Sequence, residues 1–241
     1  MRASNEQTIP TTATHPVTDT YHGTTVVDAY RWLEDATDPA VRDWTVAQNR
    51  YTRTVLDAIP ARTAIAQRLH ELYTASSTDY FTLTKRGERL FALKLQPPTE
   101  QPLLVTLQSL DDLASERVLL DPTALDPSGT TTIDFFAPSR DGSIVAVSLS
   151  QNGSEDGTLH LYETATGHQL SDLIPRVTYP TAGGDVAWNA DGSGLFYTRY
   201  PHTTERPPED RTFYQQVYFH RLGTPPEDDV YELGRDFPRI A

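Results

Sequence analysis

The residues that could carry out hydrolysis are a serine between two glycines and a few scattered histidines. Gly192-Ser193-Gly194 is the string nearest to Gly-x-Ser-x-Gly, the motif that raises a nucleophilic serine on a sharp turn between a strand and a helix. Acyl transfer by such a serine also needs a histidine and an acidic residue in support. Ser193 instead follows Asp191 in a stretch typical of a β-hairpin. We therefore predict a turn here, and no catalytic residue in this chain.

The histidines do not form a pattern typical of catalysis or metal binding. His22 lies in a crowded segment, where a packed or hydrogen-bonded imidazole is the simpler interpretation. His160 falls on an alternating strand and His168 beside a turn. No His-Glu-x-x-His or other metal-ligand spacing occurs. The chain has no Cys, which excludes disulfides, thiolate metal sites and a Cys nucleophile. We expect neither a metal nor a cofactor.

Charge and hydropathy exclude further classes of partner. The chain has 20 Lys and Arg against 33 Asp and Glu, a formal net charge of -13. Nucleic acid and anionic lipid both require clustered positive charge, so neither is an expected partner. The first residues lack the apolar core of a signal peptide, and no apolar run approaches the roughly 18 residues of a membrane span. We expect a cytoplasmic protein. The charged stretches 205–211 and 225–229 are predicted to be solvated loops.

The elements that would position a site begin with an N-terminal helical region. Residues 1–20, rich in Thr, Ser and Pro, are predicted to be an extended arm. Residues 21–35 crowd three large aromatic side chains into a non-periodic segment, which indicates that it docks on another surface. Asp38-Pro39 is a strong helix start. One helix is predicted to follow it, and a second, after Pro60, to extend to about Tyr73.

After residue 76 the periodicity changes from helical to short strands separated by turns, which predicts a second domain at 77–241. The strands fall into three groups of four. They are expected at 80–84, 89–95, 103–107 and 118–120; at 133–137, 144–149, 158–163 and Leu170; and at 186–188, 195–199, 216–220 and 230–232.

Two Asp-Gly-Ser turns, at Asp141 and Asp191, lie 191 − 141 = 50 residues apart, each between an aromatic-bearing and an aliphatic strand. A period near 50 with four strands per unit is typical of β-propeller blades. We predict a mainly β fold with an N-terminal α-helical segment and a partial propeller of about three blades. Propellers close with about four to eight blades. We therefore expect a truncated chain whose uncovered last blade favours self-association through its exposed edge.

These residues resemble the N-terminal part of the prolyl oligopeptidase family of serine peptidases, over nearly the whole chain. The family pattern of Tyr-His-Gly, then Asp-Pro-Tyr and aromatic-Leu-Glu-Asp is similar to Tyr21-His22-Gly23 followed by residues 28–35, with Ala29 where Pro is usual. Ala47-Gln48-Asn49 resembles the next signature. The stretches 136–139 with Asp141-Gly142, and 187–188 with Asp191-Gly192, resemble blade motifs. Each propeller motif alone is weak, and the ordered set is specific.

The resemblance implies a fold and a function. Residues 1–76 would pack on an α/β-hydrolase domain that carries the catalytic Ser, Asp and His and is missing from these residues. The blades would belong to a seven-bladed lid that admits only short peptides, which are cleaved after proline. Tyr179 lies at a position similar to the one from which the family presents an aromatic side chain toward bound peptide. The stretch before Trp188, residues 180–185, is longer here than in the family pattern. The chain alone would be inactive.

Two alternatives stay open at this point. The first is a non-catalytic β-propeller module that binds a peptide or protein partner through its blade faces or edges. The second is a related peptidase that prefers basic residues, which the acidic balance of the chain permits. A downstream Gly-x-Ser-x-Gly, with a later Asp and His, would distinguish a peptidase from a binding module.

Overall fold

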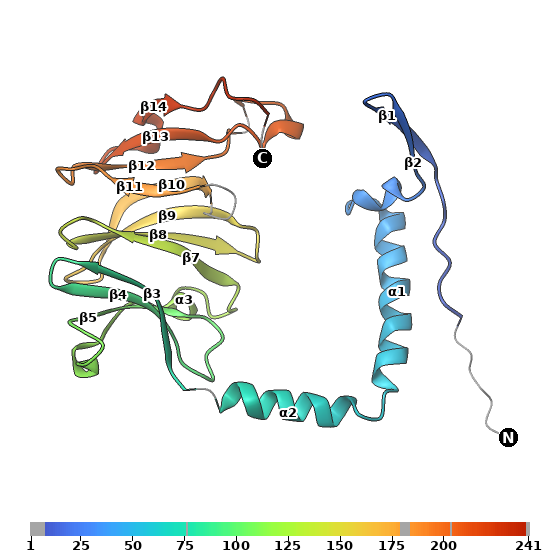
Figure 1. Ribbon diagram of the computed structural model, residues 1–241, viewed down its shortest axis with the longest axis horizontal. Helices are drawn as coiled ribbons and strands as arrows, with labels where there is room; N and C mark the ends of the chain where they lie inside the picture. Colours follow the sequence, from blue (N-terminus) through green and yellow to red (C-terminus); the bar gives the residue numbers. More distant parts are fainter. Residues whose placement is uncertain (1–7, 76, 179–183, 203, 240–241) are drawn as a thin grey trace. The chain divides into compact units, whose positions relative to one another are not determined.

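The computed structural model describes residues 8–75, 77–178, 184–202 and 204–239, and the chain divides into two compact units, Met1–Tyr73 and Thr74–Ala241 (Figure 1). The first unit contains one hairpin and two helices. The second contains twelve strands among its described residues. Short helices also occur at α3 (Pro122–Leu125) and, as 3-10 turns, at Arg31–Glu34, Leu113–Ser115, Pro208–Asp210 and Pro226–Asp228.

The N-terminal hairpin corrects the sequence interpretation. Strands β1 (Val17–Tyr21) and β2 (Thr24–Asp28) pair antiparallel across the end of the predicted arm and the start of the non-periodic segment. His22 and Gly23, the two turn residues, both have positive φ (49° and 82°), as a type I′ turn requires. The flanking β-branched Val and Thr residues favour strands. Their period-two pattern is weak because both faces of the hairpin are largely exposed.

The two predicted helices are confirmed as α1 (Pro39–Asp57) and α2 (Arg62–Thr74). Asp38 caps α1, since its Oδ1 accepts a hydrogen bond from the Ala40 backbone N–H at 2.8 Å. Pro39 occupies the first turn, where its missing N–H costs nothing. Among the described residues of both helices only Val41 is buried.

Side chains of the first unit hold the extended residues before the hairpin. The Trp44 indole N–H donates to Thr12 Oγ1 at 3.0 Å, and the Gln48 amide donates to the Pro10 carbonyl at 3.2 Å. The Trp32 indole N–H donates to the Ala13 carbonyl at 3.0 Å, and its ring lies 5.3 Å from that of His15. Trp32 of the predicted docking segment therefore packs on the arm, while Tyr30 stays exposed.

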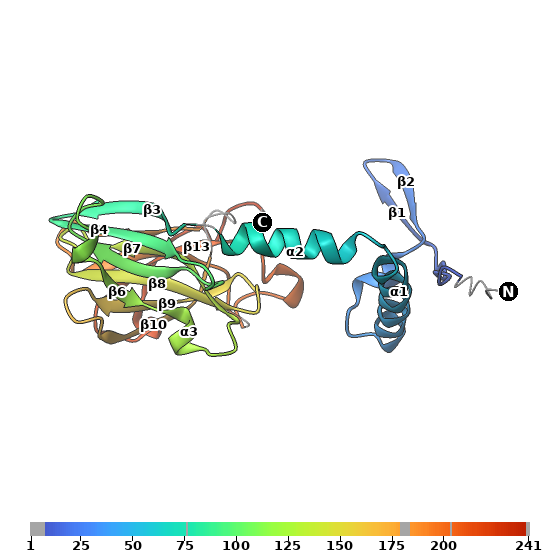
Figure 2. The ribbon, with the colours of Figure 1, turned by 90° about the horizontal axis from the view of Figure 1, so that it is seen from below.

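The second unit contains three antiparallel blades that follow one another in chain order (Figure 1). The first blade consists of β3 (Asp79–Arg86), β4 (Arg89–Leu95), β5 (Leu103–Leu107) and β6 (Arg117–Leu120). The second consists of β7 (Thr131–Pro138), β8 (Ile144–Gln151), β9 (Asp156–Glu163) and β10 (Gln169–Thr178). The third consists of β11 (Val186–Trp188), β12 (Gly194–Arg199), β13 (Gln216–Arg221) and β14 (Val230–Leu233). Seen from below, the sheet of the first blade overlies those of the other two (Figure 2). The predicted mainly β fold with a partial propeller is confirmed.

Strand β10 is longer than the single predicted position, Leu170. It runs on to Thr178 through Pro175 and a bulge at Arg176, whose φ is 61°. The proline and the bulge interrupt the alternating pattern, which is why the sequence does not reveal this part of the strand. Val177 pairs with Arg199 of β12, and this one pair joins the second and third blades into a continuous sheet.

The 50-residue repeat is visible in the hydrogen bonds of the two Asp-Gly-Ser turns. The Asp141 carboxylate accepts from the backbone and hydroxyl of Ser143 (3.0 and 2.9 Å), and the Asp191 carboxylate accepts from the same groups of Ser193 (3.0 and 2.7 Å). The intervening glycines, Gly142 and Gly192, share a φ of 73°. Equivalent positions thus make equivalent contacts, as expected of propeller blades.

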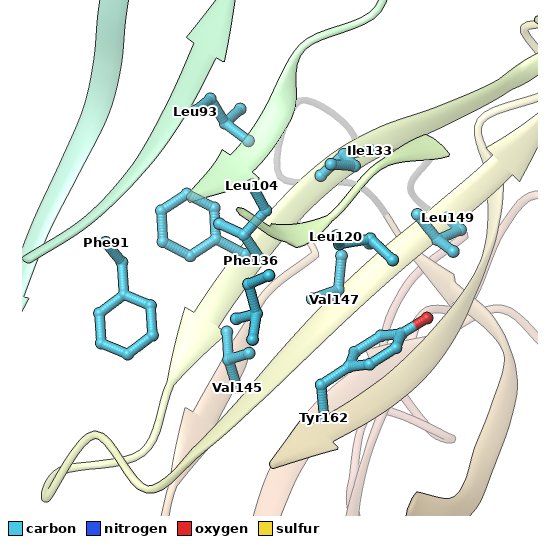
Figure 3. Close-up of a cluster of buried hydrophobic side chains, with 11 residues drawn as sticks. Phe91, Leu93, Leu104, Leu120, Ile133, Phe136, Val145, Val147, Leu149 and Tyr162 are labelled. Atoms are coloured by element: carbon cyan, nitrogen blue, oxygen red, sulfur yellow. The ribbon is translucent and has the colours of Figure 1, made fainter. Parts of the chain in front are cut away.

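The apolar core lies between neighbouring blades. Figure 3 shows Phe91 and Leu104 of the first blade facing Phe136 and Val147 of the second, and the rings of Phe91 and Phe136 are 6.5 Å apart. A second cluster, centred on Leu161 and Leu195, joins the second blade to the third. Burying a side chain of this size stabilises the fold by roughly 1.5–3 kcal/mol, so the inter-blade contacts account for much of the stability of this unit.

Candidate functional site

Ser193, the serine in the string nearest to a nucleophile motif, has a structural role. Its hydroxyl donates to Asp191 Oδ1 at 2.7 Å and accepts from the Asn189 side-chain amide at 2.9 Å. Both partners belong to the same turn, between β11 and β12. The turn predicted from the sequence is therefore present. A serine used in this way fixes a hairpin, and no described histidine is hydrogen-bonded to its hydroxyl.

A buried cluster of proton-binding groups joins the second blade to the third. The His220 ring on β13 lies between two carboxylates, with Nδ1 2.7 Å from Asp229 Oδ1 and Nε2 2.9 Å from Asp172 Oδ1 on β10. The Tyr197 hydroxyl donates to the second oxygen of Asp229 at 2.8 Å, and the Gly223 N–H donates to Asp172 at 2.6 Å. We call these residues the Asp172–His220–Asp229 network.

The network is buried, and its hydrogen bonds favour a charged imidazole. Burial opposes charge on the imidazole, but the hydrogen bonds to Asp229 and Asp172 outweigh that cost, so the pKa of His220 lies above its ordinary value. Burial, reinforced by the bond to Asp229, likewise raises the pKa of Tyr197. His220 has 0% of its surface exposed. Its position makes it a link between blades rather than a general base.

The sequence does not reveal this network. His220 was assigned only to a strand, and its partners lie 48 and 9 residues away in the chain. No spacing rule connects this histidine to Asp172 on the neighbouring blade or to Asp229 in the loop before β14. Of the histidines weighed from the sequence, His22 is exposed in the hairpin turn, and the rings of His160 and Tyr162 stack 6.4 Å apart.

A second buried charge organises the connection between β12 and β13. Both terminal nitrogens of Arg199 donate to the Glu205 carboxylate, at 2.9 and 2.8 Å, and the guanidinium lies 4.1 Å from the Tyr218 ring centre. The bond from Arg199 is the main reason why the pKa of Glu205 falls to about 2. This bidentate pair fixes the start of the loop, although residues 205–211 were predicted only to be solvated.

Tyr179, the residue predicted to face bound peptide, lies outside the described residues. Its described neighbour Arg176 has a positive φ and donates from Nη2 to the Arg211 carbonyl at 3.1 Å. On the other side, the Asp185 N–H donates to the Thr198 hydroxyl at 2.7 Å. The assignment of Tyr179 to peptide binding stays a prediction.

The described part of the chain lacks both a metal-binding cluster and a membrane-spanning helix. Within the described ranges, no group of three or more His, Cys, Asp or Glu side chains is arranged to hold a metal ion. Among the same residues, no helix has the length and apolar character needed to cross a bilayer.

Comparison with known proteins assigns the family. Residues 10–238 match the model of the prolyl oligopeptidase N-terminal β-propeller domain. The chain belongs to this family. It is 30% identical to the prolyl endopeptidase of Elizabethkingia meningoseptica over 244 aligned positions, which cover 98% of this chain and 32% of that protein. It is 28% identical to prolyl oligopeptidase A of Galerina marginata, over 85% of this chain and 30% of the relative.

Solved structures agree with the assignment to the prolyl oligopeptidase family. One, from a mechanistic study of two prolyl endopeptidases, matches with a TM-score of 0.80 and 32% identity, covering 93% of this chain and 32% of that chain. Prolyl oligopeptidase B of Galerina marginata, bound to a 35mer substrate, matches with a TM-score of 0.76 at 23% identity and so supports the fold alone. The chain spans about a third of the length of the relatives it matches.

Proposed function

We propose that this chain is the propeller-bearing portion of a serine peptidase that hydrolyses short peptides after proline. The observation that carries the proposal is the family match over residues 10–238, together with alignment to only about a third of a prolyl endopeptidase. In this proposal the nucleophile, histidine and acid belong to the remaining two thirds, and the blades restrict the size of the substrate. The buried network at His220 and the turn at Ser193 agree with a structural role for the residues described here.

The exposed apolar residues of the first unit suggest where that remaining portion binds. Ile65 and Leu69 lie one turn apart on α2 and are 55% and 47% exposed, and Tyr30 of the predicted docking segment is 49% exposed. We propose that this surface packs on the hydrolase portion. Covering each large side chain would contribute roughly 1–3 kcal/mol.

A chimaera tests the proposal directly. The chain would replace the corresponding N-terminal third of the Elizabethkingia enzyme, and both chimaera and chain would be assayed with a fluorogenic glycyl-prolyl peptide and a fluorophosphonate serine probe. We expect the chimaera to cleave the short peptide and spare a long unfolded protein, and the chain alone to show neither cleavage nor labelling. Cleavage or labelling by the chain alone would contradict the proposal. A folded but inactive chimaera would favour the alternative, a non-catalytic propeller that binds a peptide or protein partner.

The edge strand β14 supports a further expectation about the chain alone. It ends the joined sheet, and Val230 and Leu233 on it are 56% and 47% exposed. Unpaired edges of this kind pair with other chains. We propose self-association through this edge when nothing covers it. Sedimentation velocity should show oligomers that a Val230→Lys variant reduces, and a concentration-independent monomer would contradict the proposal.

A further inference from the structure

The first strands of the three blades line one groove of about 580 Å³. Strand β3 contributes Arg86, β7 contributes Phe136 and Pro138, and β11 contributes Val186 and Trp188. The volume is within the roughly 300–1,000 Å³ of small-molecule sites. The lining combines apolar side chains with two arginines. The groove lies at the convergence of the blades, away from the Asp172–His220–Asp229 network, which involves later strands.

The apolar wall is held in place by contacts between blades. The Trp188 indole N–H donates to the Ala137 carbonyl of β7 at 2.9 Å, which fixes the ring of the third blade against the second. Phe136, behind it, is buried and packs on Phe91 of the first blade. A ligand would thus meet a preformed surface, and binding would need little ordering of side chains.

Two arginines supply the charge of the groove, Arg86 from the end of β3, where the turn to β4 begins, and Arg140 from the turn after β7. The two turns touch: a Cβ on Gly87 would lie 3.1 Å from the Asp141 carbonyl oxygen, and one on Gly142 would lie 3.0 Å from the Arg86 carbonyl oxygen. The backbones that carry the guanidiniums are therefore neighbours.

Both guanidiniums are available to an anion. Arg86 uses one N–H for the Lys85 carbonyl, which leaves four of its five donors. Arg140 is exposed and makes no hydrogen bond or ion pair with any described residue. No described residue that lines the groove is acidic. In a chain with a net charge of -13, a groove lined by positive charge alone is selective for a negatively charged ligand.

We propose that this groove binds the C-terminal carboxylate of a short peptide whose last side chain is apolar. Planar guanidiniums match a carboxylate in bidentate geometry, and the wall formed by Phe136 and Trp188 suits an aromatic or aliphatic side chain. The choice of a peptide as ligand rests on the proposed function. Such a site would retain peptides by their free end.

Nuclear magnetic resonance of the chain tests the proposal without requiring peptidase activity. The Trp188 indole N–H would be followed while N-acetyl-Ala-Phe is added either as the free acid or as the C-terminal amide. We expect the acid to bind about tenfold more tightly than the amide at low salt, since one charge-assisted interaction separates them. The preference should vanish in the Arg86→Gln/Arg140→Gln double variant. It should persist in Arg221→Gln, a control that removes an exposed arginine of β13 outside the groove.

Each contrary outcome overturns the proposal. Equal binding of acid and amide would show that the carboxylate is not recognised, and an acid preference that survives in the double variant would place recognition elsewhere. Absence of any shift at Trp188 with either peptide would show that the groove is not a peptide site. None of these results bears on the chimaera, whose activity depends on residues beyond this chain.

Discussion

Residues 8–73 and the blades place the same apolar residue types in opposite environments. Among the described residues of the first unit, Val41 is the only buried apolar side chain, whereas the blades enclose Phe91, Leu104 and Leu161 completely. Both regions have regular secondary structure, two helices and a hairpin in one and paired strands in the other. Regular structure is therefore not evidence of a self-sufficient core.

The difference lies in how the elements meet. Each blade covers one face of its neighbour, because every repeat presents an apolar face to the blade beside it. The helices and hairpin of the first unit have no such succession. Their cohesion comes from hydrogen bonds such as Trp44 to Thr12 and Gln48 to Pro10, each worth about 1 kcal/mol. A unit held in this way depends on a partner surface more than the blades do.

The largest expected effect is at His220. Replacing it by Gln leaves the Asp172 and Asp229 carboxylates buried without their cation and should destabilise the blades by about 3–5 kcal/mol. His22→Gln, in the exposed turn of the first unit, is the matched control and should change stability by less than about 0.5 kcal/mol. Urea unfolding followed by Trp188 fluorescence, with Trp32 and Trp44 replaced by Phe, measures both. Similar unfolding midpoints for the two variants would show that the Asp172–His220–Asp229 network contributes nothing to the stability of the blades.

A matched pair of leucines sharpens the comparison. Leu161 on β9 is 0% exposed, so Leu161→Ala should cost about 2–5 kcal/mol through lost burial and a residual cavity. Leu69→Ala on α2 removes the same atoms from a side chain that is 47% exposed and should cost less than about 1 kcal/mol. Urea unfolding, read by Trp188 fluorescence for the blades and by helical circular dichroism for α2, compares them. Equal losses would refute the claimed difference between the units.

Two glycines isolate the packing of one blade turn on another. Gly142 and Gly192 have the same φ of 73°, so alanine causes the same backbone strain at both, about 1–2 kcal/mol. Only at Gly142 does the new Cβ approach another backbone, at 3.0 Å from the Arg86 carbonyl oxygen; at Gly192 nothing lies within 4 Å. Gly142→Ala should be about 1 kcal/mol more destabilising in thermal or urea unfolding. If the two variants have the same unfolding midpoint, the turns of the first and second blades do not restrain each other.

The smallest effect is a pH dependence confined to the blades. The pKa of His220 is raised on folding, so its contribution to stability is fully present below the unfolded-state pKa of about 6.5 and is lost as the pH rises through the folded-state pKa. The free energy of unfolding should therefore fall above about pH 6.5 in the native chain relative to His220→Gln. Parallel curves for the two proteins, obtained by urea titration at successive pH values, would show that folding does not raise the pKa of His220.

Much of the blade region could be predicted from sequence because its signals are local. Asp-Gly-Ser turns at Asp141 and Asp191 fix the hairpins, and alternating aliphatic residues mark the strands. Asp38-Pro39 likewise fixes the start of α1. These features depend on a few neighbouring residues, so no knowledge of the tertiary fold is needed.

The missed features depend on distant contacts or exposed faces. The β1–β2 hairpin shows little alternation because neither of its faces is buried by a core. The end of β10 is hidden by Pro175 and the bulge at Arg176. The network around His220 exists only because the packing of two blades places Asp172 beside β13. The spacing of these residues in the sequence does not indicate that contact.

Hydrogen exchange of the intact chain, read by mass spectrometry on peptides from each element, tests the contrast between the units most directly. We predict that amides of β4, β8 and β9 exchange only through global opening of the blades, whereas amides in the middle of α1 and α2 exchange orders of magnitude faster through local opening. Comparable protection of the helices and the blade strands would contradict the account, because it would show that the first unit has a stabilising core of its own.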